Sequence, residues 1–189
     1  MSDSECEFIE KKTKISGRGI NVFNGLTKKS AFKLEKDCLD LLNKNYECIC
    51  EKKSRHFPII HNYDDINYTF NLSYCGKTIK ELNSCATTKS ERNKYRHPNL
   101  KSQLDCIMFN LQKNKIKHLD MHKGKNLCIN KKGVLSLIDF DIAVIDDKFL
   151  SEKIEKRANY YINYEKYKKC LLWFIENGKG GSYDNTSYI

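Results

Sequence analysis

Apolar and polar positions alternate loosely at the start of the chain. Phe8 to Ile15 follows this pattern and ends at Ser16-Gly17-Arg18-Gly19, which predicts a strand followed by a glycine-rich turn. Ile20 to Phe23 predicts a second short strand, and Asn24-Gly25 supplies the two positive-φ positions of a type I′ hairpin. Leu26 to Lys29 is then its return strand. The sequence therefore predicts three antiparallel strands before residue 30.

The hydrophobic period changes from two to about 3.6 after Ser30, a plausible N-cap, which predicts a helix that ends in Asn43-Lys44-Asn45. Cys48 to Arg55 is expected to be a loop that leads at His56 to Ile60 into a strand. Tyr68 to Tyr74 alternates again and predicts another strand, which Cys75-Gly76 interrupts; a short helix is expected to begin at Thr78.

The second half of the chain is expected to be mainly helical with one embedded hairpin. Leu100 to Lys117 has apolar residues at spacings of three and four and is the strongest amphipathic helix, after a polar loop at Ala86 to Asn99. Asn126 to Ile129 and Val134 to Ile138 predict two strands joined by a turn. The pattern further predicts a final helix at Ser151 to Asn177 and a disordered tail at Gly180 to Ile189.

The segment from Lys117 to Val144 contains the most informative polar residues. Asp120, Asn126 and Asp139 have the spacing that a phosphoryl-transfer site requires. One carboxylate can face a substrate hydroxyl, while an amide oxygen and a second carboxylate can hold Mg²⁺ against nucleotide phosphates. The segment thus predicts an ATP- and magnesium-dependent site.

These residues carry a resemblance to the protein-kinase-like superfamily. His118-Leu119-Asp120 resembles the catalytic-loop H-x-D motif, Asn126 its metal-binding asparagine, and Asp139-Phe140-Asp141 the D-F-G motif with aspartate in place of glycine. The resemblance is closest to minimal members: RIO-type kinases, lipopolysaccharide core sugar kinases, and aminoglycoside or choline phosphotransferases. It covers about Ile15 to Ile175 and is weak outside the catalytic segment.

The resemblance implies an α+β class and a small bilobal fold, in which an antiparallel sheet and one helix face a truncated, mainly helical C-terminal lobe. The whole chain of 189 residues is then one kinase-like domain, with an N-lobe at 1–75, a reduced C-lobe at 76–178 and a tail at 179–189. Two features depart from the family pattern. Five residues instead of four separate Asp120 from Asn126, a difference that Gly124 can absorb, and only 50 residues follow Asp139.

The same resemblance assigns a nucleotide site. Gly17 and Gly19 are candidates for the turn that covers the phosphates, although an ordinary β-turn explains them equally well. Lys28 or Lys29 is expected to be the strand lysine that contacts the phosphates, with Glu35 on the next helix as its ion-pair partner. Lys28 is favoured because Leu26 would share its face; the alternative for either lysine is a solvated surface charge.

The remaining roles follow from the same motifs. Tyr74-Cys75-Gly76 is the expected hinge, where Tyr74 and Cys75 read the adenine edge through their backbone groups. Asp120 is the candidate catalytic base, and Lys123, or in its place Lys125, is the candidate to reach the γ-phosphate. Asn126 and Asp139 are the expected magnesium ligands. His118 is expected to brace the catalytic loop by hydrogen bonding.

Composition adds limits on the compartment and on the partners. Nine cysteines, an odd number without a regular framework, indicate reduced thiols in a cytoplasmic setting. The many Lys, Asn and Ile residues are typical of an A/T-rich genome, and if that genome is viral, the setting is the host cytoplasm. The N-terminus lacks the pattern of a secretory signal, and no apolar cluster is long enough to cross a bilayer. A net charge of +10 favours anionic partners, but the basic and acidic residues are interspersed.

One further group of residues offers a rival chemistry. Cys48-x-Cys50 is followed by His56 and His61, which together supply four ligands suited to zinc. The spacing is uncommon for a structural zinc site, and the alternative is that both cysteines lie in a loop and His56 precedes a turn.

Three functions remain open from the sequence. The first is a phosphotransferase that uses ATP and Mg²⁺ to phosphorylate a hydroxyl of a protein (Ser or Thr) or of a small alcohol or sugar. The second is a pseudokinase that keeps the fold as a binding module, which the Asp120 to Asn126 spacing and the Asp141 substitution motivate. The third is a basic nucleic-acid-binding protein, motivated by net charge alone, because the chain has no recognisable nucleic-acid-binding motif.

Overall fold

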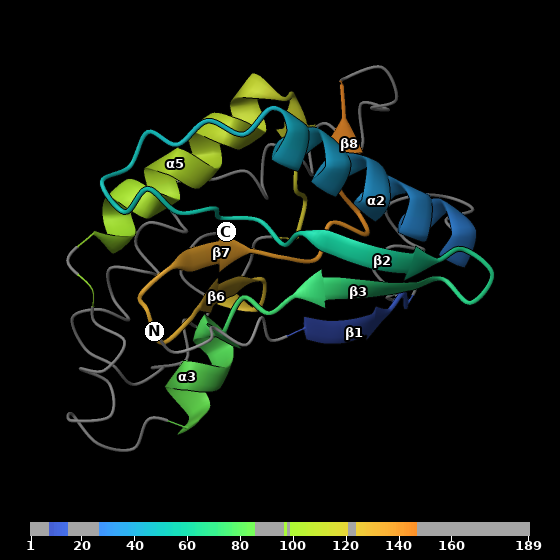
Figure 1. The fold of residues 1–189 in the computed structure, drawn as a ribbon, viewed down its shortest axis with the longest axis horizontal. Helices are drawn as coiled ribbons and strands as arrows, with labels where there is room; N and C mark the ends of the chain where they lie inside the picture. The colour runs from blue at the N-terminus through green and yellow to red at the C-terminus, as the bar shows by residue number, and fades with distance from the viewer. Residues whose placement is uncertain (1–7, 15–26, 86–96, 98, 121–123, 147–189) are drawn as a thin grey trace, which may run out of the picture.

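The structure is a computed structural model that describes residues 8–14, 27–85, 97, 99–120 and 124–146 (Figure 1). These residues form helices and antiparallel sheets, which confirms the α+β class expected from the sequence. The turn with Gly17 and Gly19, most of the loop at 86–99, Lys123, the helix expected at 151–177 and the tail lie outside the described residues.

The first sheet has three antiparallel strands in the order β1-β3-β2: β1 (Phe8–Lys12), β3 (Thr69–Ser73) and β2 (Ile60–Asp64). In the register of β1 and β3, Lys11 lies opposite Phe70. The strands expected at residues 8–15 and 68–74 are therefore confirmed, and the strand entered at Ile60 continues further than the sequence indicated.

Helix α2 (Lys28–Lys44) covers one face of this sheet (Figure 1). Its N-cap is Thr27, whose side chain accepts a hydrogen bond from the backbone N–H of Ser30 while the Ser30 hydroxyl accepts from the backbone N–H of Thr27. The expected return strand at Leu26 to Lys29 is thus wrong, because this reciprocal cap starts the helix one residue after Thr27. Lys28 and Lys29 are exposed residues of the first helical turn.

The buried face of α2 packs on the first sheet through aromatic rings. Phe32 stacks on Phe70 of β3 with 4.3 Å between ring centroids. Glu35 lies on the same buried face of the helix and is almost completely inaccessible to solvent. A buried carboxylate requires a charged or hydrogen-bonding partner, so we expect Glu35 to form an ion pair.

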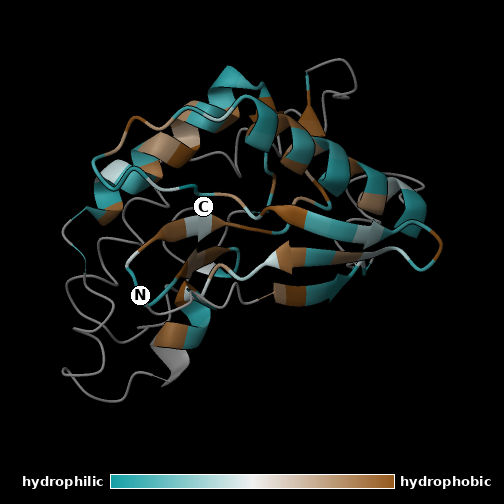
Figure 2. Ribbon diagram, viewed as in Figure 1, coloured by the Kyte–Doolittle hydropathy of each residue, from teal (hydrophilic) through white to brown (hydrophobic). Residues whose placement is uncertain are grey.

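The second sheet has the order β4-β6-β7, and its short strands are β4 (Lys77–Thr78), β6 (Leu127–Ile129) and β7 (Leu135–Leu137). The expected hairpin is confirmed as β6 and β7, which pair from Leu127 with Leu137 to Ile129 with Leu135. Helix α3 (Ile79–Cys85) follows β4 directly. All residues of β6 and β7 are buried, and these strands are mostly brown in Figure 2.

Helix α5 (Leu100–Lys113) packs on β7 and ends four residues earlier than the pattern indicated. Asn114 is its C-cap, and Lys115 adopts a positive φ of 52°, which breaks the helical hydrogen bonding. The chain then forms β5 (Ile116–Lys117), which pairs with β8 (Val144–Ile145). This pairing encloses residues 118–143, so the segments around Asp120 and Asp139 lie at one place in the fold.

Apolar side chains of both sheets and of α2 and α5 form one core, which includes the fully buried Phe70, Leu104 and Phe140. No helix in the described ranges combines the length and the apolar composition of a membrane span.

Candidate functional site

One ammonium group joins three distant parts of the chain. Lys11 Nζ on β1 donates hydrogen bonds to both carboxylate oxygens of Glu35 at 2.6 Å and to Oδ1 of Asp139 at 2.6 Å. Glu35 comes from α2, and Asp139 follows β7 and lies 128 positions after Lys11. The lysine therefore holds the helix against the segment that follows the buried hairpin.

The electrostatics of this triad favour a permanently charged lysine. Burial disfavours the ammonium, but the charges of Glu35 and Asp139 outweigh burial, so that the pKa of Lys11 is raised. Glu35 also accepts a hydrogen bond from the backbone N–H of Phe140 at 3.2 Å. Its carboxylate thus has partners on two elements, while burial, opposed by the Lys11 charge, still raises the pKa of Glu35.

The ion-pair partner of Glu35 is not the lysine that the sequence indicated. The structure brings Glu35 together with Lys11, whereas Lys28 and Lys29 are exposed at the start of α2. In protein kinases the strand lysine follows the glycine-rich turn, whereas Lys11 precedes Gly17 and Gly19 in this sequence.

Asp120 and Asn126 are in direct contact despite the additional residue between them. Asn126 Nδ2 donates to the backbone oxygen of Asp120 at 2.8 Å and to its carboxylate Oδ2 at 3.3 Å. The backbone oxygen of Asn126 in turn accepts the N–H of Ile138 at 2.9 Å, which places Asn126 opposite the residue that precedes Asp139. The three predicted residues are thus brought to one end of the β6–β7 hairpin.

Gly124 occupies a conformation that other residues rarely adopt. Its φ is +62°, and a Cβ atom added to it would lie 2.9 Å from Cβ of Ile79 on α3. Both the dihedral and the contact disfavour a side chain here. Lys125, the alternative to Lys123, is exposed next to it.

His118 connects the segment of Asp120 to the segment of Asp139 by hydrogen bonding, as the sequence indicated. Its Nε2 donates to the backbone oxygen of Ile138 at 2.9 Å, and its ring lies edge-on to Phe140 with 4.7 Å between centroids. Burial lowers the pKa of His118, so the ring is neutral at physiological pH. A neutral, buried imidazole in these contacts has a structural role.

A cavity of about 880 Å³ lies beside the Lys11–Asp139 ion pair. Lys11 and Asp139 line it from one side, and Tyr74, Cys75 and Gly76 line it at the connection between β3 and β4. Leu72 and Cys128 add apolar surface to the lining. The volume is in the range of small-molecule and cofactor sites, which take an apolar group together with a few fixed charges.

Asp141 takes the place of the glycine in the D-F-G-like motif and also lines the cavity. Burial, together with the charge of Asp139, raises the pKa of Asp141 to about 7. The pKa of Asp141 therefore lies near neutral pH, well above that of an ordinary aspartate.

Three of the predicted site residues line the cavity together with Lys11: Tyr74, Cys75 and Asp139. Glu35 is bound to Lys11. Asp120 and Asn126 contact each other at the adjacent end of the β6–β7 hairpin. Lys28 and Lys29 do not contribute to the contacts described above. Comparison of the chain with protein-family models and with curated proteins gives no match.

Proposed function

We propose that this protein is an ATP- and magnesium-dependent phosphotransferase with a protein-kinase-like arrangement of two lobes. The observation that carries the proposal is the bridge from Lys11 to Glu35 and Asp139 at the edge of the large cavity. A strand lysine paired with a helix glutamate, together with an aspartate after a short hairpin, is the constellation that phosphoryl transfer uses in kinases.

The nucleotide-binding part of the proposal places the adenine between Leu72 and Cys128, with its polar edge at the backbone of Tyr74 to Gly76. Lys11 then faces the phosphates, and Glu35 keeps its ammonium from turning away. Gly17 and Gly19, which lie in the sequence between β1 and α2, remain candidates to bind phosphate through their backbone N–H groups.

The donor set fits magnesium. Asn126 uses its amide nitrogen on Asp120, which leaves the amide oxygen as the atom to offer a cation, and Asp139 offers a carboxylate oxygen besides the one that accepts from Lys11. Hard oxygen ligands of this kind suit Mg²⁺, which neutralises phosphate charge when it is bound. Asp120 orients and accepts the proton of the attacking hydroxyl, and Lys123 or Lys125 stabilises the transferred phosphoryl group.

We expect the acceptor to be a small alcohol or sugar, or a serine or threonine of a protein. The proposal is tested by incubating the purified full chain with γ-labelled ATP and Mg²⁺, together with separate pools of basic protein, acidic protein and sugars. Labelled product is expected for one pool, and Asp139→Asn is expected to abolish it. Asp65→Asn, at an exposed turn position, is the matched control and is expected to retain activity. Equal labelling by wild type and Asp139→Asn contradicts the proposal.

The second candidate is a pseudokinase, which the buried Asp141 in place of glycine favours. Its acidic side chain beside Asp139 alters the charge that a magnesium ion would meet. Thermal-shift titration with ATP separates the candidates, because a ligand that binds only the native state raises the midpoint of unfolding. A shift that needs Mg²⁺ supports the phosphotransferase, and a shift indifferent to Mg²⁺, without transfer, supports the pseudokinase.

A further inference from the structure

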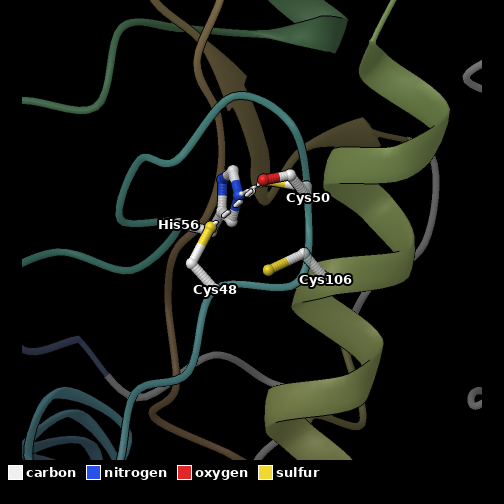
Figure 3. A group of neighbouring side chains, drawn as sticks. All are labelled: Cys48, Cys50, His56 and Cys106. Atoms are coloured by element: carbon white, nitrogen blue, oxygen red, sulfur yellow. Dashed lines mark hydrogen bonds between the residues drawn. The ribbon is translucent and has the colours of Figure 1, made fainter.

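Four side chains with metal-ligating atoms lie close together, and none of them lines the cavity of the candidate site. Cys48, Cys50 and His56 come from the connection between α2 and β2, and Cys106 comes from the middle of α5 (Figure 3). Their ligand atoms all lie within 4.8 Å of one another. The cluster joins two segments that are about 50 residues apart in the sequence, so local spacing cannot reveal it.

The distances within the cluster are close to those of a tetrahedral site. Cys48 Sγ lies 3.6 Å from Cys50 Sγ, and Cys50 Sγ lies 3.1 Å from His56 Nε2. Tetrahedral zinc with Zn–S of about 2.3 Å and Zn–N of about 2.0 Å separates its ligand atoms by roughly 3.5–3.8 Å. These two pairs are within about 0.4 Å of the tetrahedral separations, and the widest pair, at no more than 4.8 Å, must contract by up to about 1 Å to share one ion.

The orientation of His56 is already that of a metal ligand. Its Nδ1 lies 2.6 Å from the backbone oxygen of Leu135, and because a carbonyl only accepts, Nδ1 carries the proton. The lone pair of the ring is then on Nε2, which points to Cys50 (Figure 3). Donation from the second ring nitrogen to a backbone carbonyl is the arrangement that fixes ligating histidines in metal sites.

Polar groups also surround Cys106. Asn110 Nδ2 donates toward its Sγ at 3.8 Å, and the Tyr46 hydroxyl lies 3.8 Å from the same sulfur. The Tyr46 hydroxyl donates its proton to the backbone oxygen of Ser54, so Asn110 is the donor that stabilises the Cys106 thiolate, the form that binds metal. Cys50, His56 and Cys106 are buried, whereas Cys48 is exposed, so an ion can enter from the Cys48 side.

The fourth ligand differs from the one that the sequence offered. His61 lies on β2, is exposed, and packs against the ring of Phe8 with 4.5 Å between centroids. Cys106 takes its place in the cluster. The resulting Cys3His set is a common composition of structural zinc sites, whereas two cysteines and two histidines at the sequence spacing were not.

We propose that Cys48, Cys50, His56 and Cys106 bind one structural Zn²⁺ ion. Binding displaces the protons of the three thiols to solvent and forms three Zn–S bonds and one Zn–N bond, without any change of oxidation state. The ion fastens the connection after α2 to α5 and, through the His56 contact with Leu135, to β7. It thereby fixes the helix that carries Glu35 relative to the hairpin that precedes Asp139.

The test measures zinc in the full chain, purified under reducing conditions without chelator, by elemental analysis. One zinc per protein is expected for wild type. Because Cys48 is exposed, its substitutions cause little loss of packing, so Cys48→Ser removes one ligand and Cys48→His replaces it. Cys48→Ser is expected to weaken zinc affinity by at least about 100-fold, since even changes outside the ligand set cost about 10- to 100-fold. Cys48→His is expected to retain one zinc.

His61→Asn is the matched control for His56→Asn. The first is expected to keep full zinc content, and the second to lose it. Titration of metal-free wild-type protein with Co²⁺ provides a readout that needs no variant: tetrahedral thiolate ligation gives intense visible bands and a sulfur-to-cobalt charge-transfer band, which Zn²⁺ then abolishes. Wild-type protein without zinc and without these bands overturns the proposal, as does a Cys48–Cys50 disulfide in the reduced preparation. Zinc content that His61→Asn abolishes and His56→Asn retains also overturns it.

Discussion

The ring of His118 stands edge-on to the ring of Phe140, and its Nε2 donates to the backbone oxygen of Ile138. His118 lies two residues before Asp120, and Phe140 lies directly after Asp139. This single imidazole therefore sets the distance between the segment that carries the candidate base and the segment that carries a candidate metal ligand. Its protonation is expected to loosen both segments together.

The stability of the fold is expected to fall as the pH decreases below about 6.5, the ordinary histidine value. Burial lowers the pKa of His118, so in the window below 6.5 the unfolded chain binds a proton that the folded chain does not. Stability then falls with decreasing pH by at most about 1.4 kcal/mol per pH unit from this group. Urea unfolding at pH 7.5, 6.5 and 5.5 measures the effect.

His118→Gln separates this contribution from those of other groups, because an amide keeps a donor near the Ile138 oxygen and does not titrate. We expect a flatter dependence on pH for His118→Gln than for wild type. His61→Gln, at an exposed position, is the control and is expected to keep the wild-type slope. Parallel curves for wild type and His118→Gln contradict the assignment.

Removal of the Lys11 ammonium is expected to destabilise the fold strongly. Glu35 has a side-chain exposure of only 1%, so without the Lys11 ammonium it either carries an uncompensated charge or takes up a proton. Breaking a buried pair in this way costs about 3–5 kcal/mol, so Lys11→Met should lower the free energy of unfolding by that amount. Lys28→Met, at the lysine favoured from the sequence, should change it by less than about 0.5 kcal/mol.

The double variant Lys11→Met/Glu35→Gln distinguishes the structural from the chemical role of the pair. Glutamine removes the uncompensated charge and still accepts from the Phe140 N–H, so most of the lost stability is expected to return. Phosphoryl transfer is not expected to return, since the phosphates still lack their cation. Recovery of transfer in the double variant would argue that Lys11 acts only through stability.

Much of this fold follows from local patterns. The hairpin of β6 and β7 and the strand β3 could be predicted because alternation and turn residues specify them within a few positions. The start of α2 could not, since Asn24-Gly25 favoured a hairpin while Thr27 and Ser30 formed a cap that each residue alone does not indicate. The pattern of Leu100 to Lys117 did not show that Lys115 leaves helical geometry.

The residues of the two candidate sites also fall into those that the sequence predicts and those that only the fold reveals. Asp120, Asn126 and Asp139 lie close in the sequence and could be recognised by spacing, whereas Lys11 and Cys106 acquire their partners only through tertiary packing. Lys11 is one of many lysines in a basic chain, and Cys106 is one of several cysteines on apolar faces. Neither has a local feature that sets it apart, so only the folded structure identifies them.

Gly124→Ala is expected to destabilise the protein by more than the cost of its dihedral alone. An alanine at positive φ costs about 1–2 kcal/mol, and its Cβ would in addition meet Cβ of Ile79 at 2.9 Å. Gly124→Asn tests which effect dominates, because asparagine tolerates the dihedral but has the same Cβ. We expect Gly124→Asn to recover less than half of the loss in urea unfolding. Full recovery would show that the contact with Ile79 relaxes freely.

Asp120→Asn is expected to separate turnover from binding. Its carboxylate contacts Asn126, and an amide at this position can keep that contact but cannot accept a proton from a hydroxyl. Loss of a general base typically costs about 10²- to 10⁴-fold in rate, so kcat should fall by that factor while the thermal shift caused by ATP and Mg²⁺ persists. Asp139→Asn, in contrast, should reduce both, because it removes a metal ligand that is also a partner of Lys11. If the two variants lose turnover and metal-dependent binding to the same extent, the division of roles between Asp120 and Asp139 is wrong, because a base without a ligand role cannot affect nucleotide binding in this way.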